Sequence, residues 1–226
     1  MRIQLPSGTP AELALPIATG QQHPSRGLVL APDIMGLRPL FDSMCARLAA
    51  DHNWAICAPE PFPGREHLAI GERQAVMGEL EDKRQVGDLV AAADVLRDRA
   101  GCTKVAVLGF CMGGMYVLKA AGTGRFDRAV AFYGMIRVPA DWKGTGHAEP
   151  LDELRQPQAC PVLAIVGERD VFTPPADVDA LDALPNVTVI RYADAEHGFV
   201  HDPDRPAHRP DDAADAWREV IHFLKV

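Results

Sequence analysis

Short apolar runs alternate with stretches of helical periodicity along most of this chain, and that alternation limits the folds open to it. The runs expected to form buried strands cover residues 27–31, 54–58, 104–108, 128–133, 161–167 and 187–192. Between them, apolar residues recur every three or four positions, as on one face of a helix. This order of strands and helices predicts a three-layer α/β fold, in which helices flank a mostly parallel sheet.

The helical period is clearest in five places, and two long stretches lack it. The expected helices cover residues 41–49, 86–96, 112–121, about 174–184 and 213–224. Residues 59–71 and 134–158 are proline-bearing and weakly periodic, and they are too long for ordinary connections. Such segments often form lids or pocket walls, so we expect them beside the functional site.

The composition favours one domain and disfavours polyanionic partners. The chain has 226 residues, of which 47% are apolar, so it can bury one sizeable core, and we expect a single domain over residues 1–226. Lys and Arg number 23 against 31 Asp and Glu, which leaves no basic footprint for nucleic acid or anionic lipid. The sequence also shows no signal peptide and no membrane-spanning run. We therefore expect a soluble, cytoplasmic monomer or small homo-oligomer that binds neither nucleic acid nor membrane.

The cysteines and histidines give no sign of a structural metal site. The 5 cysteines are odd in number and widely separated, and none forms a C-x-x-C pair. Apart from His197 and His201, which follow an expected strand, the 8 histidines include no H-x-x-x-H pair, and no mixed cluster with carboxylates argues for a metal. We expect no disulfide framework, no metal and no cofactor.

The sequence GFCMGG, directly after the apolar run KVAVL, has the pattern of a nucleophile elbow with cysteine in the place of serine. Gly109 and Gly113 lack the Cβ atoms that would clash where a strand turns sharply into a helix, so Cys111 is expected in a strained conformation above the sheet. The first helical amides favour negative charge at this point. The alternative is a small buried apolar residue, the interpretation we hold for Cys45, Cys57, Cys102 and Cys160.

A nucleophile of this kind needs a base and an acid that orients the base, and in this fold class the acid precedes the histidine in the chain. Asp170 in GERDVFTP and His197 in DAEHGFVHD each follow an expected strand, at the end where open α/β sheets bind ligands. Glu168 and Asp194 are rival acids, and His201 is a rival base. Asp170 is otherwise a helix-capping or turn residue and His197 a solvated loop residue.

The elbow GFCMGG, the segment LVLAPDIMGL, the blocks GERD and EHGF, and the closing DAADAWREVIHFL together resemble the dienelactone hydrolase family of α/β hydrolases over almost the whole chain. The resemblance implies that Cys111 is the nucleophile, His197 the general base and Asp170 the residue that orients the histidine. It also implies an oxyanion hole formed by the backbone amides of Met112 and Ile34.

One position departs from the family pattern. The family members that match best carry a glutamate that interacts with the thiol, and this chain has Asp33 there. The aspartate side chain is one methylene shorter. Either its carboxylate still reaches Cys111 and holds the thiol proton in the resting state, or Asp33 is a turn residue at the end of a strand.

The resemblance says least about which residues contact the substrate. Members that act on anionic lactones hold the carboxylate with arginines, and Arg73 in GERQ matches one of them. The other would lie four residues after His197, where this chain has His201, with Arg205 further along. Arg73 is otherwise a residue of a solvated helix face. Trp142, in the long segment 134–158, is expected to reshape the pocket.

These features predict a hydrolase that cleaves esters or lactones of small molecules through a thioester on Cys111. Because a thiolate leaves more readily than an ordinary alkoxide, the substrate needs a stabilised leaving group, as in enol esters, aryl esters and conjugated lactones. Three other functions remain possible from the sequence: a carboxylesterase of activated esters, a redox-sensing thiol protein, or a non-catalytic scaffold of the same fold.

Overall fold

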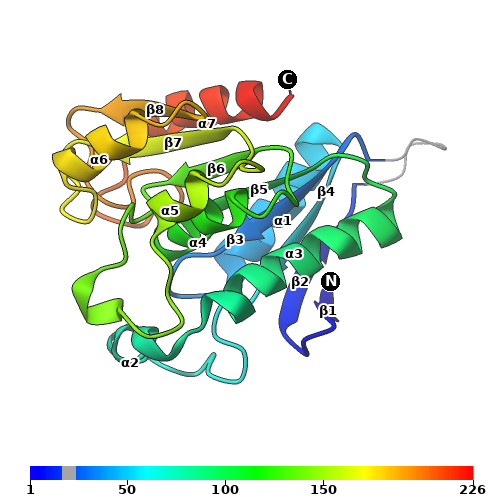
Figure 1. Cartoon of the computed structure of the whole chain (residues 1–226). Helices are drawn as coiled ribbons and strands as arrows, with labels where there is room; N and C mark the ends of the chain where they lie inside the picture. Colours follow the sequence, from blue (N-terminus) through cyan, green and yellow to red (C-terminus); the bar gives the residue numbers. More distant parts are fainter. Residues whose placement is uncertain (17–23, 226) are drawn as a thin grey trace.

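The computed structural model describes residues 1–16 and 24–225, and in them eight strands form one sheet with helices on both faces (Figure 1). The strands are β1 (Arg2–Gln4), β2 (Pro10–Ala14), β3 (Arg26–Ala31), β4 (Trp54–Pro59), β5 (Val105–Phe110), β6 (Ala129–Phe132), β7 (Val162–Gly167) and β8 (Val187–Tyr192). Their order across the sheet is β1-β2-β4-β3-β5-β6-β7-β8. Strand β2 is antiparallel to both of its neighbours, β1 and β4, and the six strands from β4 to β8 across the sheet are parallel to one another.

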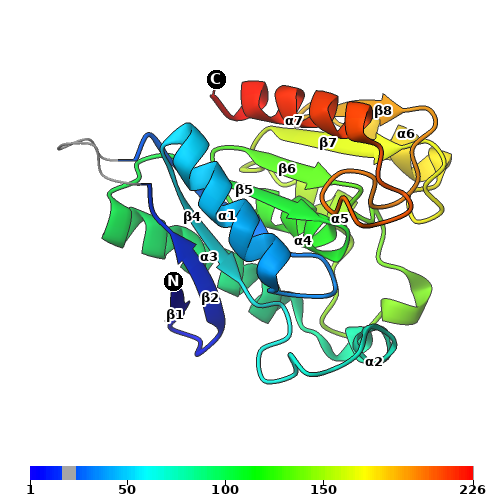
Figure 2. The same cartoon turned by 180° about the vertical axis from the view of Figure 1, so that it is seen from behind.

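Helices cover both faces of this sheet. They are α1 (Pro39–His52), α2 (Ile70–Ala75), α3 (Asp82–Ala100), α4 (Met112–Ala121), α5 (Pro150–Leu154), α6 (Pro175–Asp182) and α7 (Pro210–Lys225), with 3-10 turns η1 (Met77–Glu79) and η2 (Ala140–Trp142). Helices α3 and α4 lie on the face turned to the viewer in Figure 1, and α1 and α7 on the face seen in Figure 2. The expected three-layer α/β fold is therefore confirmed.

The helices form where an apolar stripe meets the sheet. Helix α1 buries Phe41, Met44 and Leu48 at helical spacing, and it ends where Asn53 takes the left-handed conformation with φ 55°. Strands β3 and β5 are buried along their whole length, as parallel strands between two helical layers must be. The core consequently has two halves, one on each face of the sheet.

All six expected strands are present, with ends within two residues of the prediction, but the strands β1 and β2, the short helices α2 and α5 and the 3-10 turns η1 and η2 were not expected. The hairpin β1–β2 is short and only partly buried, so it lacks the continuous apolar run that marks the inner strands. Within residues 134–158, α5 buries Leu151 and Leu154 and contacts α4. Two apolar residues in one helical turn are too weak a period to read from the sequence.

The chain connections diverge at the carboxyl ends of β3 and β5. The chain passes from β3 to β4 through α1 on one face, and from β4 to β5 through α3 on the other, so β4 and β5 flank β3 on opposite sides. Open α/β sheets bind ligands at such a switch point, because the two connections diverge there.

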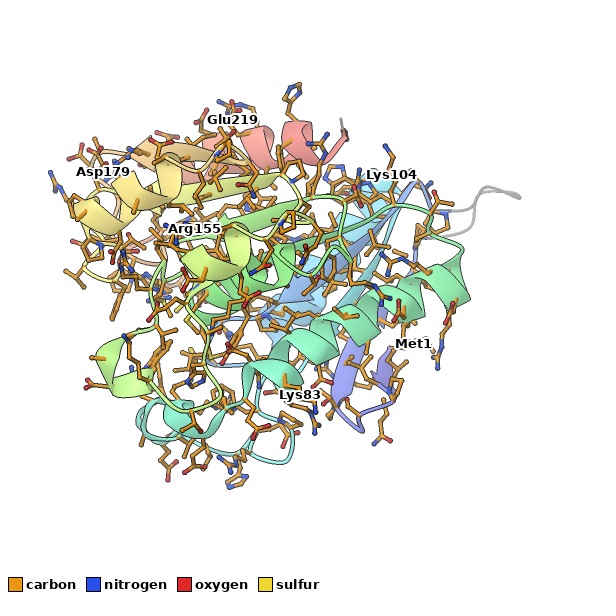
Figure 3. The ribbon with its side chains drawn as sticks, viewed as in Figure 1. Met1, Lys83, Lys104, Arg155, Asp179 and Glu219 are labelled. Carbon is orange, nitrogen blue, oxygen red and sulfur yellow. The ribbon has the colours of Figure 1, made fainter. Side chains whose placement is uncertain are left out.

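Charged side chains occupy the periphery of the molecule (Figure 3). Lys83 on α3, Arg155 just after α5 and Glu219 on α7 are all exposed. Within residues 1–16 and 24–225, no helix is both long enough and apolar enough to cross a lipid bilayer.

Candidate active site

Cys111 occupies a strained turn between β5 and α4. Its φ of 56° and ψ of −121° lie in a region that side chains with a Cβ rarely adopt. A Cβ on Gly113 would lie 2.3 Å from the carbonyl oxygens of Ala31 and Pro32, and one on Gly109 would lie 2.6 Å from the Gly113 oxygen. The two glycines therefore let the elbow close against the end of β3. The thiol is half-buried and lines a pocket.

The imidazole of His197 is held between Asp170 and this thiol. Its Nδ1 lies 2.8 Å from Oδ2 of Asp170, whose Oδ1 accepts a hydrogen bond from the Phe172 amide at 2.8 Å. Its Nε2 is buried without a well-aligned partner among the described residues. Burial lowers the pKa of His197, but hydrogen bonds and charges from Asp170 and Cys111 outweigh burial and raise it to about 9. An imidazolium is thus favoured beside the sulfur.

The rival acids and the rival base occupy other positions. Asp194 forms an exposed ion pair with Arg169 at 2.5 Å, and Glu168 is exposed. The ring of His201 is buried and bonded at both nitrogens, to Tyr133 and to Asp33. Of the three acids considered, only Asp170 bonds His197.

The other four cysteines differ from Cys111 in burial. Each is buried in the core and away from the pocket. Burial raises the pKa of Cys45, Cys57 and Cys160 to about 12 and that of Cys102 to about 11. These thiols therefore stay protonated at neutral pH, and they behave as inert, apolar side chains.

Two backbone amides near the sulfur have no partner in the described chain. These are the N–H groups of Ile34, after β3, and of Met112, the first residue of α4. The contact of Gly113 with the Ala31 and Pro32 carbonyls brings the elbow against the chain that leads to Ile34. Free amides at a helix N-terminus and a nearby loop are the donors that stabilise an oxyanion.

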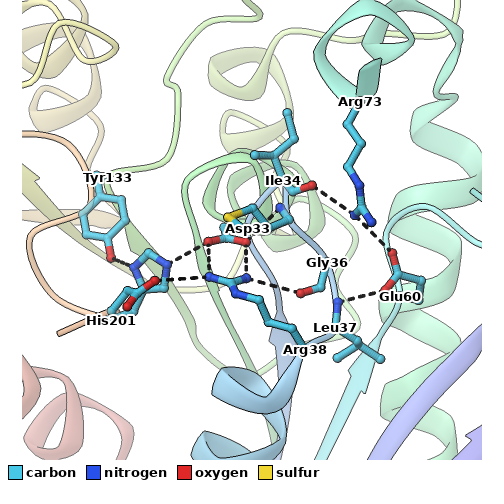
Figure 4. A network of polar contacts seen from close by, with 11 residues as sticks. Asp33, Ile34, Gly36, Leu37, Arg38, Glu60, Arg73, Tyr133 and His201 are labelled. Atoms are coloured by element: carbon cyan, nitrogen blue, oxygen red, sulfur yellow. Dashed lines mark hydrogen bonds and ion pairs between the residues drawn. The ribbon is translucent and has the colours of Figure 1, made fainter. Parts of the chain in front are cut away.

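Asp33 belongs to a buried network and makes no hydrogen bond to the thiol in the described structure (Figure 4). Its Oδ1 accepts bonds from the Met35 amide at 2.9 Å and from Arg38 at 2.7 Å. Its Oδ2 accepts from Arg38 at 3.0 Å and from Nε2 of His201 at 2.9 Å. The geometry thus agrees with the turn-residue alternative for Asp33.

A single set of protons satisfies this network. Burial raises the pKa of Tyr133 well above its usual value and lowers that of His201, so both groups are neutral at pH 7. The Tyr133 hydroxyl then donates to Nδ1 of His201, and the proton on Nε2 of His201 points to Asp33. His201 is thereby fixed in one tautomer, and it does not line the pocket.

The pocket next to Cys111 and His197 has a volume of about 310 Å³ and mostly apolar walls. Its lining residues are Asp33, Ile34, Met35, Ile70, Gln74, Cys111, Met135, Trp142, Phe172, His197, Asp202 and Arg205. Trp142 is among them, as expected for the segment 134–158. Arg73 is not: its side chain is buried behind the wall and contacts backbone carbonyls. The structure therefore contradicts both Arg73 and His201 as substrate contacts.

Sequence reasoning missed three residues that shape the site. Tyr133 follows β6 with φ 39°, and its ring contacts His197 edge-on at 5.2 Å between centroids. Arg38 binds Asp33, and Glu60 accepts hydrogen bonds from the Leu37 and Phe62 amides. No motif marks these contacts. Among the described residues, no group of three His, Cys, Asp or Glu side chains is arranged to hold a metal ion.

Changing Asp33 to asparagine should destabilise the fold at neutral pH and much less in acid. Burial raises the pKa of Asp33, but its bonds from His201 and Arg38 outweigh burial and lower the pKa from 3.8 to about 2. The shift corresponds to about 2 kcal/mol of stability, present above pH 4 and lost as the pH falls toward 2. Urea unfolding of the wild-type protein and of Asp33→Asn at pH 7, 5 and 3 measures the difference in their free energies of unfolding. Asp202→Asn, which removes a more exposed carboxylate near Arg38, is the control. If the loss of stability caused by Asp33→Asn does not shrink between pH 5 and pH 3, the lowered pKa of Asp33 is contradicted.

Comparison with known proteins identifies the family of this chain. The model of the dienelactone hydrolase family matches residues 13–226. A Bradyrhizobium protein assigned as a 2-oxo-3-(5-oxofuran-2-ylidene)propanoate lactonase is 29% identical, over 95% of this chain and 88% of its own. A carboxymethylenebutenolidase from Rhodococcus opacus is 27% identical, over 88% and 80%.

Solved structures show the same fold. A Klebsiella pneumoniae protein assigned as a dienelactone hydrolase superposes with a TM-score of 0.86 at 22% identity, covering 100% of this chain and 97% of its own. At that identity the likeness establishes the fold alone. The family match spans nearly the entire sequence, from β2 to the C-terminus. This chain therefore belongs to the dienelactone hydrolase family of hydrolases.

Proposed function

We propose that the protein hydrolyses carboxylic esters or lactones of small molecules through a thioester on Cys111. The observation that supports this most is the thiol in the strained elbow, beside a histidine that Asp170 orients, at a pocket of about 310 Å³. The relatives assigned as a lactonase and as a carboxymethylenebutenolidase act on unsaturated lactones by name, which supports the same bond type here.

In the first half of the reaction, the Cys111 sulfur attacks the carbonyl carbon of the substrate. A carbon–sulfur bond forms, and the carbonyl electron pair moves to the oxygen. The amides of Ile34 and Met112 stabilise that oxyanion. When the intermediate collapses, the bond to the alcohol oxygen breaks, and His197 gives its proton to the departing oxygen. The raised pKa of His197 suits it to carry this proton at the start.

In the second half, water cleaves the thioester. The hydrogen bond and the charge of Cys111 are two of the causes that raise the pKa of His197. Once the sulfur is acylated, both are lost, so the pKa of His197 falls and the neutral imidazole is available to take a proton from water. The sulfur then leaves as a thiolate, the acid product departs, and the His197 proton restores the resting pair.

Sulfur limits the substrates that can react. A thiolate is a better leaving group than an alkyl alkoxide, so the tetrahedral intermediate reverts unless the alcohol is activated. Enol esters, aryl esters and conjugated lactones meet this condition. The apolar walls, with Phe172, Trp142 and Ile70, suit a flat unsaturated acyl group.

Arg205 is the cation available to an anionic substrate in this pocket. Its guanidinium lies against Gly198, next to His197. This guanidinium, unlike the backbone of Arg205, forms no ion pair or hydrogen bond with the described residues. The pocket wall also holds two carboxylates, Asp33 and Asp202, and each lies within an ion-pair distance of Arg38. We expect Arg205 to bind a carboxylate of the substrate.

The test compares p-nitrophenyl acetate with mono-p-nitrophenyl succinate, whose acyl group carries an additional carboxymethyl group and hence a negative charge. We expect both to acylate Cys111, seen as a mass increase on the peptide that contains it. Arg205→Gln should lower the preference for the succinate by about 10- to 100-fold, the value of one charge-assisted contact. Arg209→Gln, which removes an arginine paired with Asp212 outside the pocket, is the control. If no substrate labels Cys111, the proposed function is wrong.

A further inference from the structure

Arg73 is buried, yet almost everything it bonds is backbone. Only 5% of the residue is exposed. Its Nε donates to the Leu68 carbonyl oxygen at 2.9 Å, one Nη to the Glu66 carbonyl oxygen at 2.5 Å, and the other Nη to the Ile34 carbonyl oxygen at 3.2 Å. The guanidinium also lies over the Phe62 ring, 4.9 Å from its centroid. The side chain therefore joins the segment before α2 to the loop after β3. Figure 4 shows its contacts with Ile34 and Glu60.

The loop after β3 is packed tightly against this guanidinium. Gly36 has φ +70°, and a Cβ there would lie 2.6 Å from Glu60 and 2.7 Å from Arg73. Glu60 in turn lies 3.8 Å from Arg73 and accepts the Leu37 amide at 2.8 Å. The buried guanidinium is thus partly balanced in charge, and the loop has no room to move toward it.

The contacts fix two consecutive peptide groups. The Asp33 carbonyl accepts the Gly36 amide at 2.9 Å, and in a trans peptide the Ile34 N–H points the opposite way. The next peptide is held at both ends, because Arg73 binds the Ile34 oxygen and Asp33 binds the Met35 amide. The direction of the free Ile34 N–H is therefore set by this loop. Glu60 and His201 also bind the loop from outside, and Arg73 is the outside residue that binds the Ile34 carbonyl itself.

We propose that Arg73 is a positioning residue for the oxyanion hole: it fixes the Ile34 backbone so that the Ile34 amide meets the developing oxyanion. The role rests on the proposed Cys111 chemistry. Its effect belongs to the transition state, since the oxyanion exists only after attack. Arginine suits the task because its planar fork reaches three carbonyls at once, which the single ammonium of lysine does not. Substrate charge plays no part, which separates this role from carboxylate binding.

The test uses Arg73→Met and Arg73→Lys, with acylation followed as a p-nitrophenolate burst. Losing one oxyanion donor costs about 10²- to 10³-fold, so we expect acylation by the neutral and the anionic ester to slow equally, by about 10²-fold. KM should stay within about threefold. Alkylation of Cys111 by iodoacetamide, which forms no oxyanion, should also stay within about threefold of wild type.

Arg26→Met is the matched control, because Arg26 is equally buried but lies at the opposite end of β3, paired with Asp127. It should lower the melting temperature as Arg73→Met does and leave acylation unchanged. If Arg73→Met does not fold, Arg73→Lys keeps the charge and carries the test. A selective rise in KM for the anionic ester, or equal losses in alkylation and acylation, overturns the proposal. A wild-type protein that forms no Cys111 adduct overturns the proposed function and this role together, before any variant is compared.

Discussion

Replacing Cys111 by alanine should lower kcat for ester hydrolysis on the order of 10⁴- to 10⁶-fold, the cost of removing the nucleophile from a catalytic triad. The elbow holds this sulfur at φ 56°, and the other thiols are buried with raised pKa values, so no other cysteine can substitute. Steady-state hydrolysis of p-nitrophenyl acetate measures the loss. Cys102→Ala, which removes a thiol from outside the pocket, is the control and should retain activity.

The double variant with His197→Ala tests whether the two side chains act as one unit. His197→Ala alone should remove nearly as much turnover as Cys111→Ala, because a thiol without its base is seldom ionised. The double variant should then be little worse than either single one. Losses that multiply would show two independent contributions, and the Cys–His pair would be excluded.

The elbow and the fold class were predictable because each follows from local sequence. Gly109 and Gly113 flank Cys111 where only glycine fits, because a Cβ at either position would overlap the neighbouring backbone. The inner strands are buried on both faces, so their apolar runs are continuous. The places of Asp170 and His197 follow from the same rule, since both lie just past the carboxyl end of a parallel strand.

The polar network behind the pocket was not predictable, because its contacts join distant parts of the chain. Asp33 and His201 are 168 positions apart, and Tyr133 reaches His201 only because its backbone turns at φ 39°. Arg73 illustrates the same limit. A motif places an arginine on a helix, but the direction of its guanidinium depends on which carbonyls surround it. The family pattern thus supplied the position and not the contacts.

Changing Asp170 to asparagine should lower kcat by about 10²- to 10⁴-fold while the protein stays folded. The amide keeps the shape of the carboxyl group, and its oxygen can still accept the Phe172 amide. Its nitrogen donates toward Nδ1 of His197, which moves the ring proton to Nε2, the atom that must accept the thiol proton. Asp194→Asn, at the exposed pair with Arg169, is the matched control.

The same change should lower the pKa of His197, since the carboxylate is one of the causes that raise it to about 9. The raised value means that the stability contributed by His197 is complete below pH 6.5 and is lost as the pH rises through about 9. In Asp170→Asn, that loss should begin at lower pH. Long-range ¹H–¹⁵N spectra follow the titration directly, and a His197→Gln sample assigns the signal. An unchanged His197 titration would mean that Asp170 does not support the imidazolium, and its part in orienting the base would have to be given up.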